Sequence, residues 1–410
     1  MTQDPAVAAL HRRTLRTVVF SQMLGGAGLA AGVSVGALLA EDMLGHEGVA
    51  GLPAGLFTLG SALAAFLIGR SSQVVGRRRG LAGGFAAGAI GAVGIVIAAV
   101  LDQPLLFFCA LFVYGAGSAT NLQARYAGTD LAPADQRASA ASVALVATTL
   151  GAVAGPNLIE PLGDLAAWLD IPRLAGPFLL AAVAYGLAAL VLFCFLRPDP
   201  LLTARALAET TPRSVATGHP EPSTAPVGLI PGVVLGATVM VLTQFTMAAI
   251  MTMTPVHMRH HDHGLSAVGL VIGLHIAAMY LPSLVTGRLV DRVGRTPMAV
   301  AAAATLLAAG VVAAVAPGKS MVLITLALVL LGLGWNFGLI AGTALIVDST
   351  PLHSRARTQG SVDVLVALAG AAGGVGSGVI VGLTDFATLS LLGGGIALVL
   401  VPVVAWYRRA

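Results

Sequence analysis

The sequence predicts an all-α polytopic membrane protein with twelve transmembrane helices in two pseudo-symmetric six-helix halves. The 410-residue chain has a mean hydropathy of +0.91 and only 10% charged residues, whereas soluble globular proteins have about 25%. Twelve apolar runs are long enough to span a bilayer as helices. Segments of the two halves also match each other at one fixed offset, which indicates an internal repeat.

The twelve apolar runs are separated by short polar loops, with one exception. The runs lie near 17–40, 49–69, 81–101, 104–123, 138–159, 174–196, 229–254, 265–286, 297–316, 320–346, 358–383 and 387–407. Residues 197–228, between the sixth and seventh runs, are rich in Pro, Thr, Ser and charged side chains and therefore predict a cytoplasmic linker. The expected organisation is a six-helix bundle at 1–196, this linker, and a second six-helix bundle at 229–410.

The basic residues predict the orientation, because cytoplasmic loops carry an excess of Lys and Arg. With a cytoplasmic N-terminus, nineteen arginines fall in cytoplasmic segments, and only Arg173, Arg259 and Lys319 fall outside. The C-terminus is then cytoplasmic as well. The net charge of +4 thus reflects topology, and because the arginines are scattered among short loops we expect no nucleic-acid binding. Cys109 and Cys194 each lie in an apolar run, which argues against a disulfide framework.

The internal repeat has an offset of 218 residues. Gly69, Gly76, Arg77, Asp130, Pro133 and Arg137 recur as Gly287, Gly294, Arg295, Asp348, Pro351 and Arg355. The matching segments follow the second and fourth helix of each half, in cytoplasmic loops. Parallel repeats of this kind are typical of transporters whose halves rock about a site near the bilayer midplane.

Four soft side chains in the seventh and eighth runs are candidate metal ligands. Met247 and Met251 share one helix face because residues at i and i+4 lie on the same side, and so do His275 and Met279. If the two faces meet, three thioethers and one imidazole converge, a set that suits Cu(I) better than Mg, Ca or Mn. A histidine at membrane depth is costly and usually functional. The alternative is that the methionines only fill the core, as flexible apolar side chains do.

A histidine-rich segment joins these two runs on the external side. It reads His257-Met258-Arg259-His260-His261-Asp262-His263. Dense histidine tracts are typical of metal binding. The candidate residues for metal capture are therefore His257, Met258, His260, His261 and His263.

Two charged residues within or beside the spans are candidates for coupling or gating. Asp363 is the one clear acidic residue inside a span, and it could exchange protons or form a structural pair with Arg77 or Arg78. Arg125 lies at the inner end of the fourth run, where the simpler interpretation is a solvated interface arginine. The polar residues Gln244, Trp335 and Asn336 could line a central cavity or hydrogen-bond a neighbouring helix.

The loop Gly287-Arg-Leu-Val-Asp291-Arg-Val-Gly294-Arg295 resembles the loop signature of the major facilitator superfamily, and the resemblance extends over the whole chain. It implies the major facilitator fold, with Asp291, Arg295 and Arg77 as gating residues of a cytoplasmic latch. The first copy of the signature has Gln73 where the family has Asp. The sequence alone does not determine how strong the latch is at Gln73.

The Met-x-x-x-Met and His-x-x-x-Met pairs in the seventh and eighth runs resemble the CcoA-like branch of that superfamily, which imports copper. The resemblance implies a monomer of the bacterial cytoplasmic (inner) membrane that needs no cofactor and takes copper as its transported substrate. Copper chaperones that serve haem-copper oxidase assembly would be its partners. The same branch contains members linked to riboflavin uptake.

A second function remains open. Gly151-Ala-Val-Ala-Gly155-Pro156 resembles a helix-five signature common in proton-driven exporters, which favours a proton-coupled antiporter or facilitator of a drug, metabolite or riboflavin. No nucleotide-binding loop, catalytic triad or zinc-protease motif occurs in the sequence. Both hypotheses therefore describe a secondary transporter rather than an enzyme.

Overall fold

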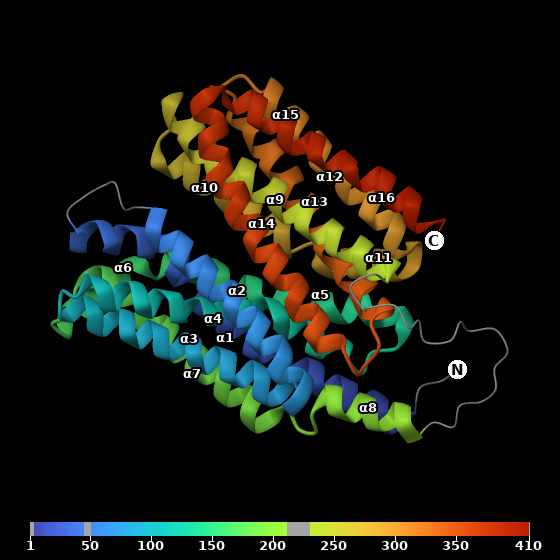
Figure 1. Cartoon of the computed structure of the whole chain (residues 1–410). Coiled ribbons are helices and arrows are strands. Elements are labelled where there is room, and N and C mark those ends of the chain that lie inside the picture. Colours follow the sequence, from blue (N-terminus) through green and yellow to red (C-terminus); the bar gives the residue numbers. More distant parts are fainter. Residues whose placement is uncertain (1–3, 45–50, 211–229, 410) are drawn as a thin grey trace. The chain divides into compact units, whose positions relative to one another are not determined.

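The computed structural model describes residues 4–44, 51–210 and 230–409, and all regular structure in these ranges is helical (Figure 1). Ten helical stretches within them are long and apolar enough to cross a membrane. The other two predicted runs lie in α1 (Pro5–Leu44) and α5 (Arg137–Asn157). The all-α polytopic architecture expected from hydropathy is thereby confirmed.

The chain forms two compact units, and each is described here by itself. Unit 1 comprises Met1–Pro133, Val143–Ile230 and Thr350–Val364, and unit 2 comprises Ala134–Ser142, Pro231–Ser349 and Leu365–Ala410. The division follows the two halves of the chain except at two helices. The first residues of α5 group with unit 2, and the first ten residues of α14 (Arg355–Leu383) group with unit 1.

Helix α4 is the centre of unit 1. The helices of this unit, besides α1 and most of α5, are α2 (Gly51–Val75), α3 (Arg77–Val100), α4 (Pro104–Thr129), α6 (Ile159–Trp168), α7 (Gly176–Phe195) and α8 (Pro200–Thr210). Helix α4 packs against α1, α2 and α3, and α3 also packs against α7. Tyr114, Phe85 and Tyr185 are buried where these helices meet, with the Tyr185 ring 5.6 Å from each of the other two. Such aromatic pairs add packing energy beyond the area they bury.

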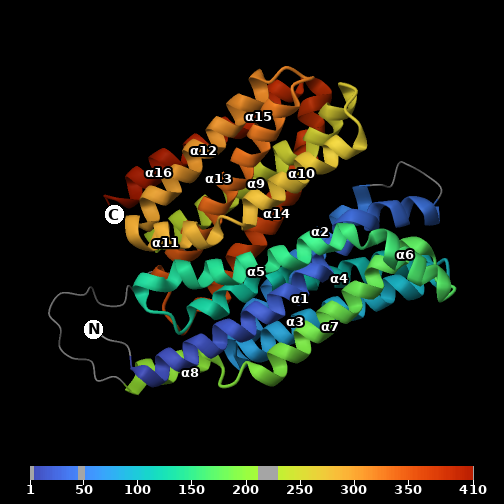
Figure 2. The ribbon, with the colours of Figure 1, turned by 180° about the vertical axis from the view of Figure 1, so that it is seen from behind.

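Helix α13 has the equivalent place in unit 2. The helices of this unit, besides most of α14, are α9 (Pro231–His260), α10 (Leu265–Tyr280), α11 (Ser283–Val293), α12 (Arg295–Val315), α13 (Met321–Ser349), α15 (Phe386–Ile396) and α16 (Leu400–Tyr407). Helix α13 packs against α9, α10 and α12 (Figure 2). The two central helices begin 217 residues apart, so they correspond to each other under the sequence repeat.

The helix boundaries differ from the apolar runs at three places. The run at 265–286 is two helices, α10 and α11, because Pro282 interrupts the helical hydrogen bonding between them. The run at 387–407 is divided by a 3₁₀ turn at Ala397–Val399. The predicted linker contains α8, and its residues 211–228 lie outside the described ranges.

The backbone conformation explains why the loop signature has glycine at 76 and 294. Gly76 ends the turn between α2 and α3 with φ 90°, and Gly294 does the same between α11 and α12 with φ 109°. Side chains disfavour positive φ, whereas glycine adopts it without steric cost. The two turns therefore have the same backbone conformation in both units, as the repeat predicts.

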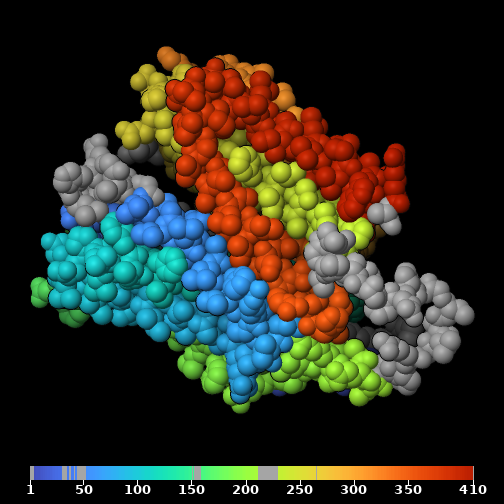
Figure 3. Space-filling view, viewed as in Figure 1, coloured from blue at the N-terminus to red at the C-terminus, as the bar shows by residue number. Residues whose placement is uncertain are grey.

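Helix α14, in orange, lies at the surface seen in Figure 3, and several of its large apolar side chains are exposed. Val375 and Leu383 are 76% and 80% exposed, and Leu365 and Leu368 are exposed as well. In water such a surface would favour aggregation, whereas in a bilayer lipid tails cover it without cost. The exposed face is thus what a membrane-spanning helix requires.

Candidate functional site

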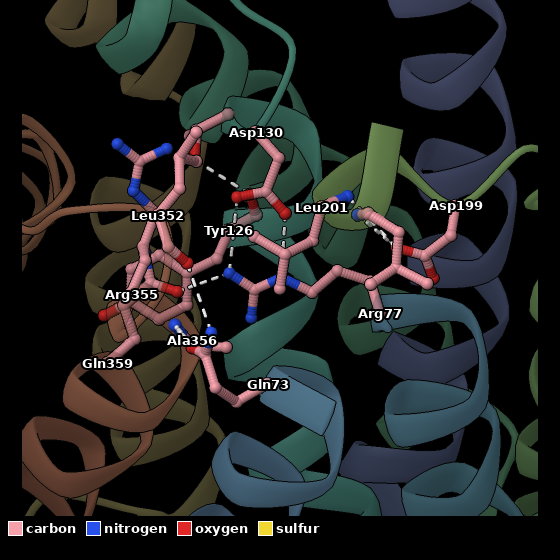
Figure 4. A network of polar contacts seen from close by, with 12 residues as sticks. Gln73, Arg77, Tyr126, Asp130, Asp199, Leu201, Leu352, Arg355, Ala356 and Gln359 are labelled. Carbon is pink, nitrogen blue, oxygen red and sulfur yellow. Dashed lines mark hydrogen bonds and ion pairs between the residues drawn. The ribbon is translucent and has the colours of Figure 1, made fainter. Parts of the chain in front are cut away.

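Arg77, the first residue of α3, and Asp130, just after α4, form a buried ion pair in unit 1. The Arg77 Nε atom donates to Asp130 Oδ2 at 2.8 Å, and both side chains are fully buried. The Arg77 Nη2 atom also donates to Gln359 Oε1 at the start of α14 (Figure 4). Hydrogen bonds between ionised groups are about twice as strong as neutral ones. Arg77 therefore links three helices, α3, α4 and α14, at one point.

Gln73 caps the N-terminus of α14. Its Oε1 atom accepts from the backbone N–H groups of Ala356 and Arg357, at 2.7 and 3.2 Å. Its Nε2 atom donates to the carbonyls of Leu352 and His353, at 3.1 and 2.8 Å. The first N–H groups of a helix lack partners within the helix, so a side-chain acceptor there stabilises it. At the position where the family has Asp, Gln73 thus caps the helix with a neutral side chain.

Unit 2 contains a charged counterpart of this helix cap. Asp291 accepts from the backbone N–H groups of Ala138 and Ser139 at the start of α5, at 3.1 and 2.8 Å. Arg295 donates to Asp348 at 2.9 Å, the equivalent of the Arg77–Asp130 pair, and Arg137 donates to Asp348 at 2.6 Å. Arg295 therefore takes the place in unit 2 that Arg77 has in unit 1, and Asp291 takes the place of Gln73. Their gating role stays a prediction.

Arg125 and Asp363 form a second buried ion pair in unit 1. The Arg125 Nη2 atom donates to Asp363 Oδ1 at 2.8 Å, with the two side chains 0% and 2% exposed. The same Nη2 atom donates to the Tyr126 hydroxyl at 2.8 Å, and that hydroxyl lies 3.4 Å from Asp363 Oδ1. The expectation of a solvated Arg125 was wrong, because the countercharge of Asp363 allows the guanidinium to be buried. The partner of Asp363 is Arg125, not Arg77 or Arg78.

The residues around Arg125 include some that sequence reasoning missed. Tyr126 follows Arg125 directly and contacts both members of the pair, and Asp130 is the residue just after α4, at its C-cap. Asp130 carried a signal, since it recurs as Asp348 in the repeat. Tyr126 and Gln359 carried none, because their role depends on contacts between helices distant in the sequence.

His275 is buried inside unit 2 with one ring nitrogen engaged. Its Nδ1 atom lies 2.8 Å from the carbonyl oxygen of Leu328 in α13, and because a carbonyl only accepts, Nδ1 carries the hydrogen. The Nε2 atom is buried and has no hydrogen-bond partner among the described residues. In the neutral ring this nitrogen holds a free lone pair.

The three methionines proposed as metal ligands lie on two helices: Met247 and Met251 on α9, and Met279 on α10 with His275. Met247 and Met279 are both buried, each 8% exposed, and Met251 is half-buried. Helices α9 and α10, which carry the set, contact each other and both pack on α13. Whether the four side chains reach a common ion stays a prediction.

The histidine-rich segment forms the end of α9 and the turn after it. His263 Nε2 lies 3.0 Å from the Gly318 carbonyl oxygen, His261 Nδ1 lies 2.9 Å from the His257 carbonyl oxygen, and the His257 ring stacks on Phe386. Met258 is fully buried. No group of three or more His, Cys, Asp or Glu side chains within the described residues is placed to hold a metal.

The remaining polar candidates bond to neighbouring helices. Trp335 Nε1 donates to Gln244 Oε1 at 2.8 Å, joining α13 to α9. Asn336 Nδ2 donates to the Met279 carbonyl and to the Ser283 hydroxyl, at 2.7 and 2.8 Å. In the motif at 151–156, residues 152–156 lie outside those whose surroundings the structure describes.

Comparison with known proteins identifies the family. The model of the Major Facilitator Superfamily matches residues 17–374 and 236–410. The chain is 60% identical over 400 residues to the "Uncharacterized MFS-type transporter YdeG" of Bacillus subtilis (strain 168), covering 98% of this chain and 93% of that protein. It is 30% identical over 406 residues to the "Riboflavin transporter RfnT" of Brucella anthropi, covering 97% and 96%.

Solved structures show the same fold at lower identity. The human organic anion transporter MFSD10 (TETRAN) matches with a TM-score of 0.77 and 18% identity, over 98% of this chain and 100% of that chain. The proton:xylose symporter XylE matches with a TM-score of 0.71 and 15% identity, over 96% and 94%. At such identities the likeness concerns the fold alone. From the family model and the full-length relatives, we conclude that this chain belongs to the Major Facilitator Superfamily and is a multi-pass membrane transporter.

Proposed function

We propose that this transporter imports copper, as Cu(I), across the bacterial cytoplasmic membrane by alternating access. The observation that carries the proposal is the state of His275. Its side chain is fully buried, its Nδ1–H is bound to the Leu328 carbonyl, and its Nε2 atom has no partner within the described part of the chain. Histidines that bind metals typically donate their other ring N–H to a carbonyl or carboxylate, which fixes the ring.

The neighbours of His275 suit a soft cation. Met279 lies one turn further along α10, and Met247 is buried on α9, which contacts α10. Thioether and imidazole ligands favour Cu(I), and as neutral ligands they would release the ion more readily than thiolates. Met251, half-buried on the same face of α9 as Met247, would be an outer member of the path.

The test measures uptake of radiolabelled Cu(I) in cells that express each variant at equal levels. His275→Asn places an amide N–H near the position of Nδ1, so it can keep the bond to the Leu328 carbonyl while it removes the second nitrogen. We expect His275→Asn, Met247→Leu and Met279→Leu each to lower uptake by about tenfold or more. Met240→Leu is the matched control, because Met240 is buried on α9 but packs against Gly342. Wild-type uptake in His275→Asn and Met247→Leu would disprove a copper path through these residues.

A second candidate substrate is a planar organic molecule such as riboflavin. It is supported by the 30% identical relative, whose name states riboflavin transport, and by an aromatic group in unit 2. The Tyr280 ring meets the Trp335 ring edge-on at 5.6 Å, and Trp335 is held by Gln244. Aromatic rings beside an amide would stack on and hydrogen-bond to a heteroaromatic solute.

Growth of a riboflavin-auxotrophic strain on low riboflavin tests the second candidate. If riboflavin is the substrate, the wild type restores growth, Trp335→Leu does not, and neither changes cellular copper. If the wild-type protein raises copper uptake but does not rescue the auxotroph, copper rather than riboflavin is supported as the substrate. For both substrates we expect a monomer with cytoplasmic N- and C-termini, and for copper we expect chaperones of haem-copper oxidase assembly as acceptors.

A further inference from the structure

The Arg125–Asp363 pair differs from the nearby Arg77–Asp130 pair in one respect. Arg77 donates to both carboxylate oxygens of Asp130, at 2.8 and 3.4 Å. Asp363, in contrast, accepts hydrogen bonds from Arg125 and Tyr126 through Oδ1 only. Its Oδ2 atom is buried and has no hydrogen-bond partner in the described ranges. A buried carboxylate oxygen without a donor costs free energy, since water would otherwise bind it. The open oxygen is therefore a place where a proton could bind.

The charges in the cluster around Asp363 cancel when Asp363 is ionised. Among the described residues, the ionisable groups that act on it are Arg125 and Tyr126 from α4 and Arg77 from α3, and Arg77 is already paired with Asp130. Two guanidinium groups and two carboxylates give no net charge. A proton on Asp363 would leave one positive charge buried without its partner, which is strongly unfavourable. Protonation of Asp363 and separation of Arg125 from it are consequently linked.

Asp363 lies at the end of the part of α14 that belongs to unit 1. The segment at 355–364 is held in that unit by the Gln73 cap and by a close crossing at Gly69 and Gly360. A Cβ on Gly360 would lie 2.7 Å from the Ala65 carbonyl oxygen and 2.7 Å from the Gly69 Cα atom. Beyond residue 364 the same helix belongs to unit 2. Loss of the Arg125–Asp363 bond would therefore weaken the hold of unit 1 on segment 355–364.

We propose that Asp363 is a binding site for a coupling proton and that Arg125 is its charge partner. A proton from water binds Oδ2, the carboxylate becomes a neutral acid, and the ion pair with Arg125 breaks. The guanidinium stays charged, and segment 355–364 is released from α4. The proton site rests on the proposed secondary transport, and it identifies the proton as the ion that would drive that transport.

The first test detects the proton without any transported solute. Infrared difference spectroscopy of the purified protein in lipid records the high-frequency C=O stretch of a buried protonated carboxylic acid on acidification. We expect this band in the wild type and in Asp130→Asn, the matched buried carboxylate, and we expect its loss in Asp363→Asn. If Asp363→Asn does not fold, the double variant Arg125→Gln/Asp363→Asn, which buries no unpaired charge, takes its place. A band that persists without Asp363, or no band in the wild type, would overturn the proposal.

The second test separates coupling from transport in proteoliposomes, with Cu(I) and riboflavin as probes. Asp363→Asn is expected to lose accumulation driven by a pH gradient while it keeps the exchange of external labelled for internal unlabelled probe. Equal pH-driven accumulation in wild type and Asp363→Asn contradicts the proton site. If the wild type moves neither probe, the proposed substrates fail, and the infrared result alone decides the role of Asp363.

Discussion

Gln73 and Asp291, which lie 218 residues apart, each cap the first turn of a helix through their side-chain oxygens. Gln73 binds the start of α14 in unit 1, and Asp291 binds the start of α5 in unit 2. A carboxylate at a helix N-terminus gains about 0.3–1 kcal/mol from the helix dipole, which a neutral amide forgoes. Gln73 compensates with two donated hydrogen bonds, to the carbonyls of Leu352 and His353.

Replacing Gln73 by the Asp that the family has there should therefore weaken the cap on α14. Gln73→Asp keeps an acceptor for α14 but removes both donors and places a negative charge beside two carbonyl oxygens. We expect a loss of about 1 kcal/mol of stability, from net hydrogen-bond energies of about 0.5–1.5 kcal/mol each against the dipole gain. Thermal unfolding in detergent measures it, with Asp291→Asn as the comparison at the equivalent position. A higher unfolding temperature for Gln73→Asp would show that charge outweighs the two donated bonds.

The Arg125–Asp363 pair should show strong energetic coupling. Asp363→Asn leaves the Arg125 charge buried without its counterion, so we expect a loss of about 3–5 kcal/mol. Arg125→Gln should cost a similar amount for the opposite reason. The double variant should cost clearly less than the sum, because no unpaired charge remains buried. Unfolding midpoints of the four proteins give the coupling energy, and simple additivity of the two losses would contradict a direct pair.

The crossing of α2 and α14 should not tolerate a larger residue. Gly360→Ala introduces a Cβ against the Ala65 carbonyl and Gly69, both backbone groups that cannot rotate away. We expect a loss of about 1–3 kcal/mol, the usual cost of overpacking. Gly376→Ala is the control on the same helix, since no atom lies within 4 Å of its added Cβ. There we expect no loss, and a gain of up to about 1 kcal/mol from helix propensity. Equal thermal stability of the two variants would rule out a tight crossing.

His11, near the start of α1, should make stability depend on pH. Burial, assisted by the neighbouring Arg12, lowers the pKa of His11 below its usual value of 6.5. The unfolded chain then binds a proton at a higher pH than the folded one, so stability is retained above about pH 6.5 and falls as the pH drops below it. His11→Gln should flatten this decline between about pH 7 and pH 5. The exposed His260→Gln is the control, and an unchanged pH profile in His11→Gln would exclude this contribution.

Several features could be predicted from the chain alone because they depend on local chemistry. Long apolar runs must form helices in a membrane, since no water is present to bind their backbone groups. The glycines at 76 and 294 were recognisable from the repeat, and the positive φ at both turns explains why glycine recurs. The matched pairs Arg77–Asp130 and Arg295–Asp348 were also visible as repeats, although their partnership was not.

The partners of the buried charges could not be predicted. Arg125 and Asp363 are 238 residues apart, and nothing in the sequence around either one indicates the other. The break of the eighth run at Pro282 and the helix α8 inside the linker were missed for a simpler reason, since mean hydropathy does not record hydrogen bonding.

The sequence by itself determined an all-helical membrane protein with two repeated halves, because hydrophobicity and turn geometry act over a few residues. Only the tertiary structure decided that Arg125 is buried rather than solvated and that Gln73 still caps a helix. It also decided that one ring nitrogen of His275 has no hydrogen-bond partner among the residues that are described. Whether a polar side chain is tolerated at depth depends on which group meets it from another helix. That pairing is set when distant segments pack, and local sequence does not encode it.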